Sequence, residues 1–133
     1  MSVKIISKYI GDSRIEIEHG PSRSTIVTDL PVDNGGKGRM FSPTDLIPAS
    51  LSSCVLTIMS KMAEKNGLDI KGCSIEIEKH MQENPRRISR LAGAVTFPSH
   101  LSELHRKKLL ACVKTCPVHK SLHPDIEIEI KEI

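Results

Sequence analysis

Apolar and polar residues in the first third of the chain follow the pattern of β-strands. Residues 4–9 and 14–19 are rich in apolar β-formers on either side of Gly11-Asp12, which predicts a hairpin. A third strand is predicted over residues 24–28, and the glycine-rich residues 31–40 predict a flexible loop.

The middle of the chain has the apolar spacing of a long helix. Ser42-Pro43-Thr44-Asp45 has the features of a helix start, because Ser42 can cap, Pro43 suits the first position and Asp45 resembles the acidic member of a capping box. Gly67 ends the pattern, so the helix is predicted to span about 24 residues, or roughly 36 Å. Pro48 is expected to bend its first turns. The apolar positions are Leu46, Ile47, Leu51, Cys54, Val55, Ile58, Met59 and Met62.

The second half of the chain predicts three strands and two helices. In order, these are a strand over residues 73–83, a turn at Asn84-Pro85, a strand over 91–97, a helix over 102–113, a short helix from Cys116-Pro117 to Leu122, and a strand over 125–133. The whole order is βββ-α-ββ-α-α-β. It predicts one α+β domain over residues 1–133, with helices packed on an antiparallel sheet.

Composition and charge limit the classes of function. Hydrophobic residues make up 38% and charged residues 26% of the chain, as in soluble globular proteins. Only three residues are aromatic, which is compatible with burial against a second subunit. The net charge of +3 is spread out, so no nucleic-acid partner is expected.

The expected location is the cytoplasm. No N-terminal segment resembles a signal peptide, and the strongly apolar stretches look shorter than the ~20 residues that a membrane span needs. No phosphate loop or dinucleotide fingerprint occurs, and we expect no cofactor. In the cytoplasm, the four cysteines are interpreted as free thiols, catalytic groups or metal ligands rather than structural disulfides.

Two cysteines are candidates for chemistry. Cys54 lies on the apolar face of the long helix, where a buried cysteine is often only a small hydrophobic residue. Cys116 precedes a proline at a predicted helix N-terminus, where free N–H groups favour the thiolate, although cap chemistry alone also accounts for a polar residue there. A second hypothesis is a metal site on one helical face, with Cys112, Cys116, His119 and His123 as ligands; Pro117 breaks that face.

Two segments of the chain resemble the signature segments of the OsmC/Ohr family. They are Ser42-Pro43-Thr44-Asp45-Leu46, followed eight residues later by Cys54, and Cys116-Pro117-Val118-His119-Lys120. The order of elements is also similar to that family along nearly the whole chain. The resemblance implies an OsmC-like α+β fold with an antiparallel sheet packed on a long central helix, in an intertwined homodimer.

The resemblance also implies a peroxidase cycle. Cys54 would attack an organic hydroperoxide, release an alcohol and become a sulfenic acid, and Cys116 would condense with it to a disulfide. A dithiol reductant would restore both thiols.

By the same resemblance, an arginine held by a carboxylate activates the first thiol. Arg23 is the best match, Arg39 is its competitor, and Asp45 is the candidate carboxylate. The family has Glu where this chain has Thr44, one residue before Asp45. That departure suggests a divergent subgroup, and the rival hypothesis is a non-catalytic binding or stress protein with the same fold.

Overall fold

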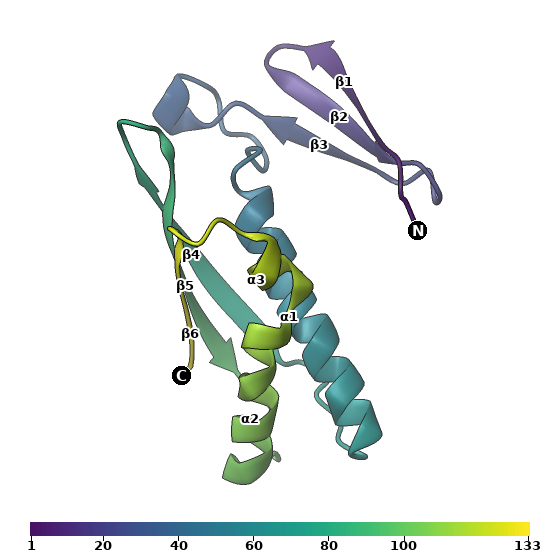
Figure 1. The fold of residues 1–133 in the computed structure, drawn as a ribbon. Helices are drawn as coiled ribbons and strands as arrows, with labels where there is room; N and C mark the ends of the chain where they lie inside the picture. The colour runs from purple at the N-terminus through teal and green to yellow at the C-terminus, as the bar shows by residue number, and fades with distance from the viewer. The chain divides into compact units, whose positions relative to one another are not determined.

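The computed structural model describes all residues from Met1 to Ile133, and they form two compact units. The first unit is Met1–Leu46 and the second is Ile47–Ile133 (Figure 1). The prediction of one domain over the whole chain stays a prediction.

The first unit is a three-stranded antiparallel sheet with a loop. Its strands are β1 (Ile5–Gly11), β2 (Arg14–His19) and β3 (Thr25–Asp29), in that order across the sheet. Asp12 and Ser13 both have positive φ, as the tight turn of a β1–β2 hairpin needs. This confirms the predicted hairpin and third strand. The predicted loop includes the short 3₁₀ helix η1 (Val32–Asn34).

The first unit buries polar rather than apolar side chains. Thr28, Asp29 and Ser42 are its almost fully buried residues, whereas large apolar side chains are exposed along its strands. The exposed ones include Ile5, Ile6, Tyr9, Ile10, Ile26 and Phe41. The sheet therefore has apolar surface that its own 46 residues do not cover.

The long helix α1 (Leu46–Lys65) begins later than predicted, and residues 43–45 form a turn before it. Pro48 is accommodated in the first turn of α1, where a backbone N–H would have no acceptor within the helix. The buried residues recur every three or four positions, which confirms the predicted apolar face. They are Pro48, Leu51, Val55, Met59 and Ala63.

The expectation that no apolar stretch is long enough for a membrane span was wrong. By length and composition α1 alone among the helices could cross a membrane. The core helix of a soluble protein can have the same length and composition. Leu51, Val55 and Met59 of α1 belong to the core of the second unit.

The second unit has a three-stranded sheet with the order β4 (Ser74–Gln82), β5 (Arg87–Thr96) and β6 (Glu127–Glu132). β4 and β5 form an antiparallel hairpin whose turn contains a cis Asn84-Pro85 bond. β6 runs parallel to β5, so the prediction of an antiparallel sheet holds for β4 and β5 but not for β6. The sheet is mixed.

Three helical segments connect the parallel strands β5 and β6. They are α2 (Glu103–Leu110), the 3₁₀ helix η2 (Ala111–Thr115) and α3 (Pro117–Ser121). Ser102 caps α2 as predicted, because its hydroxyl accepts a hydrogen bond from the backbone N–H of His105 at 3.2 Å. α2 is shorter than predicted, since its last turn tightens into η2.

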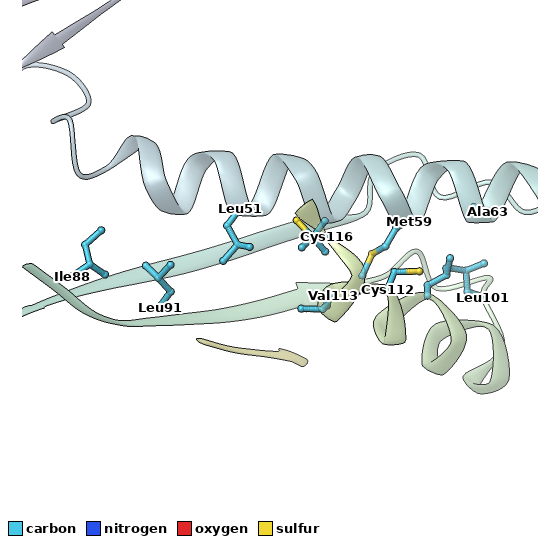
Figure 2. Packing of buried hydrophobic residues seen from close by; sticks show 11 residues of the cluster. Leu51, Met59, Ala63, Ile88, Leu91, Leu101, Cys112, Val113 and Cys116 are labelled. Carbon is cyan, nitrogen blue, oxygen red and sulfur yellow. The ribbon is translucent and has the colours of Figure 1, made fainter. Parts of the chain in front are cut away.

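The core of the second unit lies between its helices and one face of its sheet. Figure 2 shows Leu51 and Met59 pointing from α1 toward the strands and Cys116 lying beside α1. Gly93 on β5 faces this core between Ile77 and Ile130, where a Cβ atom would come within 3.0 Å of the Ile130 side chain. The buried cluster consists of Leu51, Val55, Met59, Ala63, Ile88, Leu91, Leu101, Leu109, Cys112, Val113 and Cys116.

Candidate active site

The fold of the second unit brings Cys54 and Cys116 together. Cys54 projects from α1, and Cys116 stands at the junction of η2 and α3. Cys54 packs against the buried cluster that contains Cys116, and the two thiols are close enough for Cys54 to raise the pKa of Cys116. Two thiols that are 62 residues apart in the sequence are therefore neighbours in the fold.

The two thiols differ in exposure. Cys54 is half-buried, whereas Cys116 is 0% exposed and belongs to the apolar core. Solvent therefore touches part of Cys54 and none of Cys116. The two cysteines therefore differ in their exposure to solvent.

Local chain geometry fixes the position of Cys116. The residue is extended (φ −64°, ψ 125°), and Pro117 follows it at the first position of α3. Proline suits this position, because its fixed φ matches the helix and its missing N–H is not needed there. Cys116 is the N-cap residue of α3, but its side chain makes no capping hydrogen bond.

The prediction that Cys116 favours the thiolate was wrong. Burial raises the pKa of the Cys116 thiol, and its interaction with Cys54 raises that pKa further. The N–H groups of His119 and Val118 act in the opposite direction, but burial outweighs them. Cys116 is therefore a protonated thiol at neutral pH.

The candidate carboxylate Asp45 lies in the first unit, where it forms a reciprocal capping box with Ser42. The Ser42 N–H donates to Asp45 Oδ2 at 2.8 Å, and the Asp45 N–H donates to Ser42 Oγ at 3.1 Å. The neighbouring Thr44 hydroxyl is 3.2 Å from that of Ser42. The predicted hydrogen bonds between Ser42 and Asp45 are confirmed, but they close the turn over residues 43–45 that precedes α1, and the catalytic role of Asp45 stays a prediction.

The two candidate arginines also belong to the first unit. Arg23 is in the turn between β2 and β3, and its side chain is 75% exposed with Nη1 3.4 Å from Glu18 Oε1. Arg39 is held far more firmly: its Nε donates to Asp29 Oδ2 at 2.8 Å and its Nη1 to Asp12 Oδ2 at 2.7 Å. Of the two, only Arg39 is held by a buried carboxylate.

Asp29 is the residue that the sequence-based reasoning missed. Its buried carboxylate accepts hydrogen bonds from the side chain and backbone N–H of Arg39 and from the N–H of Leu30. The Arg39 guanidinium holds the pKa of Asp29 well below its usual range and raises its own pKa in turn. The position of an acidic residue at the end of a strand, ten residues before Arg39, was the only signal available.

The other two thiols are separate from the pair. Cys112 Sγ lies 3.4 Å from Met62 Sδ, and burial raises the pKa of both Cys112 and Cys73. The hypothesis of a metal site is not supported, because no three His, Cys, Asp or Glu side chains are grouped so that they could hold an ion.

The second unit has a cavity that is separate from the two thiols. It has a volume of about 530 Å³ and is lined by Leu56, Ser60, Leu68 and Cys73 among others, but not by Cys54 or Cys116. Any apolar pocket for a substrate at the thiol pair is therefore not this cavity.

A family model for OsmC-like proteins matches residues 36–131, which include both thiols. The chain belongs to the OsmC family. This OsmC protein is 42% identical to a Psychrobacter arcticus protein that bears a provisional description as an osmotic-stress-induced and detoxification response protein. The match covers 100% of this chain and 96% of that one, with a TM-score of 0.91.

More distant solved structures show that this OsmC protein has the OsmC/Ohr fold. The organic hydroperoxide resistance protein OsmC of Legionella pneumophila is 15% identical, with a TM-score of 0.79 and coverage of 99% of this chain and 96% of that one. An organic hydroperoxide resistance protein of Elizabethkingia anophelis is 11% identical, with a TM-score of 0.77 and coverage of 99% and 95%. No match was found among the curated proteins.

Proposed function

We propose that this OsmC protein is a thiol-dependent peroxidase that reduces organic hydroperoxides to alcohols. The observation that carries the proposal is that a partly exposed Cys54 packs against the buried cluster that contains the fully buried Cys116. A peroxidatic thiol must be accessible to its substrate, and a resolving thiol must lie near the peroxidatic thiol. The organic hydroperoxide resistance proteins among the structural neighbours support the class of substrate.

The proposed reaction has two steps on the enzyme. The Cys54 thiolate attacks one oxygen of the O–O bond, the alkoxide leaves and takes a proton as the alcohol, and Cys54 becomes a sulfenic acid. The Cys116 sulfur then attacks the Cys54 sulfur and water leaves, which produces a disulfide. Cys116 is the thiol near Cys54 that can take this part. A dithiol reductant completes the cycle.

The experiment that tests this function is a thiol map after one equivalent of cumene hydroperoxide. We expect a Cys54–Cys116 disulfide, with Cys73 and Cys112 still free. The Cys116→Ser variant should stop at the Cys54 sulfenic acid, which a dimedone probe would label. Four free thiols after the treatment would contradict the proposal and favour the non-catalytic protein that Thr44 suggests.

An arginine of the first unit is proposed to favour the thiolate of Cys54, since a cation near a thiol stabilises its ionised form. Arg23 was the first choice from the sequence, but the pairing of Arg39 with buried Asp29 supports Arg39. We expect Arg39→Ala to slow alkylation of Cys54 by iodoacetamide at pH 7 more than Arg23→Ala does. A slower reaction in Arg23→Ala alone would restore the first choice.

A homodimer and a cytoplasmic location are also proposed. The exposed apolar side chains of the first unit, such as Ile6, Tyr9 and Ile26, support burial against a second subunit. Light scattering of the purified protein would measure its mass, and a monomer of 14.7 kDa would contradict the dimer. In the cytoplasm, the reducing environment would keep Cys54 and Cys116 as free thiols.

A further inference from the structure

The cavity of about 530 Å³ in the second unit has the size of a binding site for a small molecule. It lies between the C-terminal half of α1 and residues 68–73, which lead from α1 toward β4. Cavities that bind small ligands have volumes of roughly 300–1,000 Å³. Neither Cys54 nor Cys116 lines this cavity, so a molecule bound there would be distinct from the hydroperoxide substrate.

The walls of the cavity are mainly apolar. Leu56 and Ala63 are seven residues apart on α1, which places them on one face of the helix. Leu68 and Ile70 face them from the loop, and all four side chains are buried or half-buried in the packing of the second unit. A hydrocarbon chain in this cavity would leave water and contact these side chains, which is favourable.

Hydrogen bonds hold the loop wall in place without a ligand. Gly67 ends α1 with a φ of +65°, and the Leu68 N–H donates to the Ala63 carbonyl at 2.9 Å. Farther along the loop, the Nε2 atom of His100 lies 2.8 Å from the carbonyl oxygen of Asp69. A wall that is already ordered loses little conformational freedom when a molecule binds, so less binding energy is lost.

The charge at the cavity favours a cation. Glu64 and Asp69 contribute two carboxylates, and Lys71 contributes one ammonium group. The C-terminal end of α1, which ends at Lys65, adds the partial negative charge of the helix dipole. A positively charged group is therefore attracted to this cavity, whereas a negatively charged group is repelled by most of its rim.

We propose that this cavity binds a small aliphatic ammonium compound. The hydrocarbon chain lies against Leu56, Ala63 and Leu68, and the ammonium group lies at the rim beside the carboxylates of Glu64 and Asp69. Apolar walls select the chain, and the negative rim selects the charge of the head group. A fatty carboxylate with the same chain would find the same walls but the wrong charge.

Cys73 allows the proposal to be tested in the wild-type protein, because this half-buried thiol lines the same cavity. Alkylation of Cys73 by iodoacetamide at pH 7.5 is followed by mass spectrometry, with and without octylammonium chloride. An alkylamine, like the lysine side chain, is protonated at this pH. At ten times its Kd, octylammonium should slow the alkylation of Cys73 about tenfold and leave the rate at Cys54 unchanged.

Two matched sets separate the chain from the charge and the cavity from the rest of α1. Octanol and octanoate have the same chain length, and we expect them to protect Cys73 less than octylammonium, with octanoate the weakest. Ser60→Trp places a large side chain in the cavity and should abolish the heat of octylammonium binding in calorimetry. Thr57→Trp, one turn earlier on α1 and outside the lining, should preserve it. Glu64→Gln should weaken binding about two- to fivefold.

Several results would overturn the inference. The first is an unchanged rate of Cys73 alkylation at every octylammonium concentration. The second is equal protection by octylammonium, octanol and octanoate, which would show that the rim does not select a cation. Binding that persists in Ser60→Trp would place the ligand elsewhere. No hydroperoxide is used in these measurements, so their outcome is independent of the proposed peroxidase function.

Discussion

Replacement of Gly93 by alanine tests how tightly β5 packs against its neighbours. The new Cβ atom would lie 3.0 Å from Ile130 Cγ1 on β6 and 3.3 Å from Ile77 Cγ1 on β4. Carbon atoms in contact prefer separations of about 3.5–4.0 Å, so both distances are too short. Either the strands or the two isoleucine side chains must move.

The expected cost follows from two opposing effects. An extra methyl group in a packed core costs about 1–3 kcal/mol, while removal of a glycine from the unfolded chain returns about 0.4–1 kcal/mol. We therefore expect Gly93→Ala to lower the free energy of unfolding by about 1–2 kcal/mol. Urea denaturation followed by far-UV circular dichroism should show a lower midpoint with an unchanged slope.

A double-mutant cycle identifies the source of this cost. Ile130→Ala removes the side chain that the new Cβ would meet at 3.0 Å, and it will be destabilising by itself. In that background Gly93→Ala should cost about 1 kcal/mol less than in the wild type. An equal cost in both backgrounds would show that the contact with Ile130 is not the reason and would refute the reasoning.

Three further predictions concern the turn before α1, the core and the buried ion pair. Ser42→Ala removes the hydroxyl that accepts from Asp45 N–H and should lower the free energy of unfolding by about 1 kcal/mol in the same denaturation assay. No change would mean that this hydrogen bond, which closes the turn before α1, does not stabilise the fold. Leu51→Ala should cost about 2–5 kcal/mol, because this side chain is 0% exposed, and a loss below about 1 kcal/mol would contradict its place in the core. Arg39 holds the pKa of Asp29 below its usual range, so the stabilising effect of the ionised carboxylate is complete above about pH 4 and is lost as the pH falls through the lowered pKa. Asp29→Asn should thus be less stable than the wild type at pH 7, with a difference that shrinks in acid, and a difference independent of pH would count against the ion pair.

Local features of the sequence were enough to predict most elements of the fold. The capping box at Ser42 and Asp45 is formed by residues three positions apart, and the apolar face of α1 repeats within one helix. The β1–β2 hairpin likewise depends on a turn of adjacent residues. Interactions of this kind involve only near neighbours, so the chain reveals them without knowledge of the tertiary structure.

Features set by distant residues could not be predicted in this way. The alternation over residues 125–133 indicates a strand but not its direction, and the direction of β6 depends on the path of the chain from β5. The pKa of Cys116 was predicted in the wrong direction because a helix N-terminus is visible in the sequence, whereas burial by Leu51 and Leu91 is not. The pairing of Arg39 with Asp29 was missed because a loop separates them.

The proximity of the two thiols was implied by the family resemblance alone. Each cysteine had an ordinary interpretation: Cys54 as a core residue, and Cys116 as a residue at a helix start. The structure of the second unit adds what neither segment shows, namely that one thiol is accessible and the other is enclosed. That inequality is the basis for the proposed order of attack and resolution.

The connection between the parallel strands β5 and β6 also has a consequence for folding. Cys116 lies within this connection, so it reaches Cys54 only after α2, η2 and α3 have docked against α1. A Cys54–Cys116 bond would close a loop of 62 residues, and in the chain-entropy description it would stabilise the folded state by roughly 4 kcal/mol relative to the unfolded state. The oxidised protein should therefore have a higher melting temperature than the reduced protein, so the melting temperature would report the redox state of the two thiols.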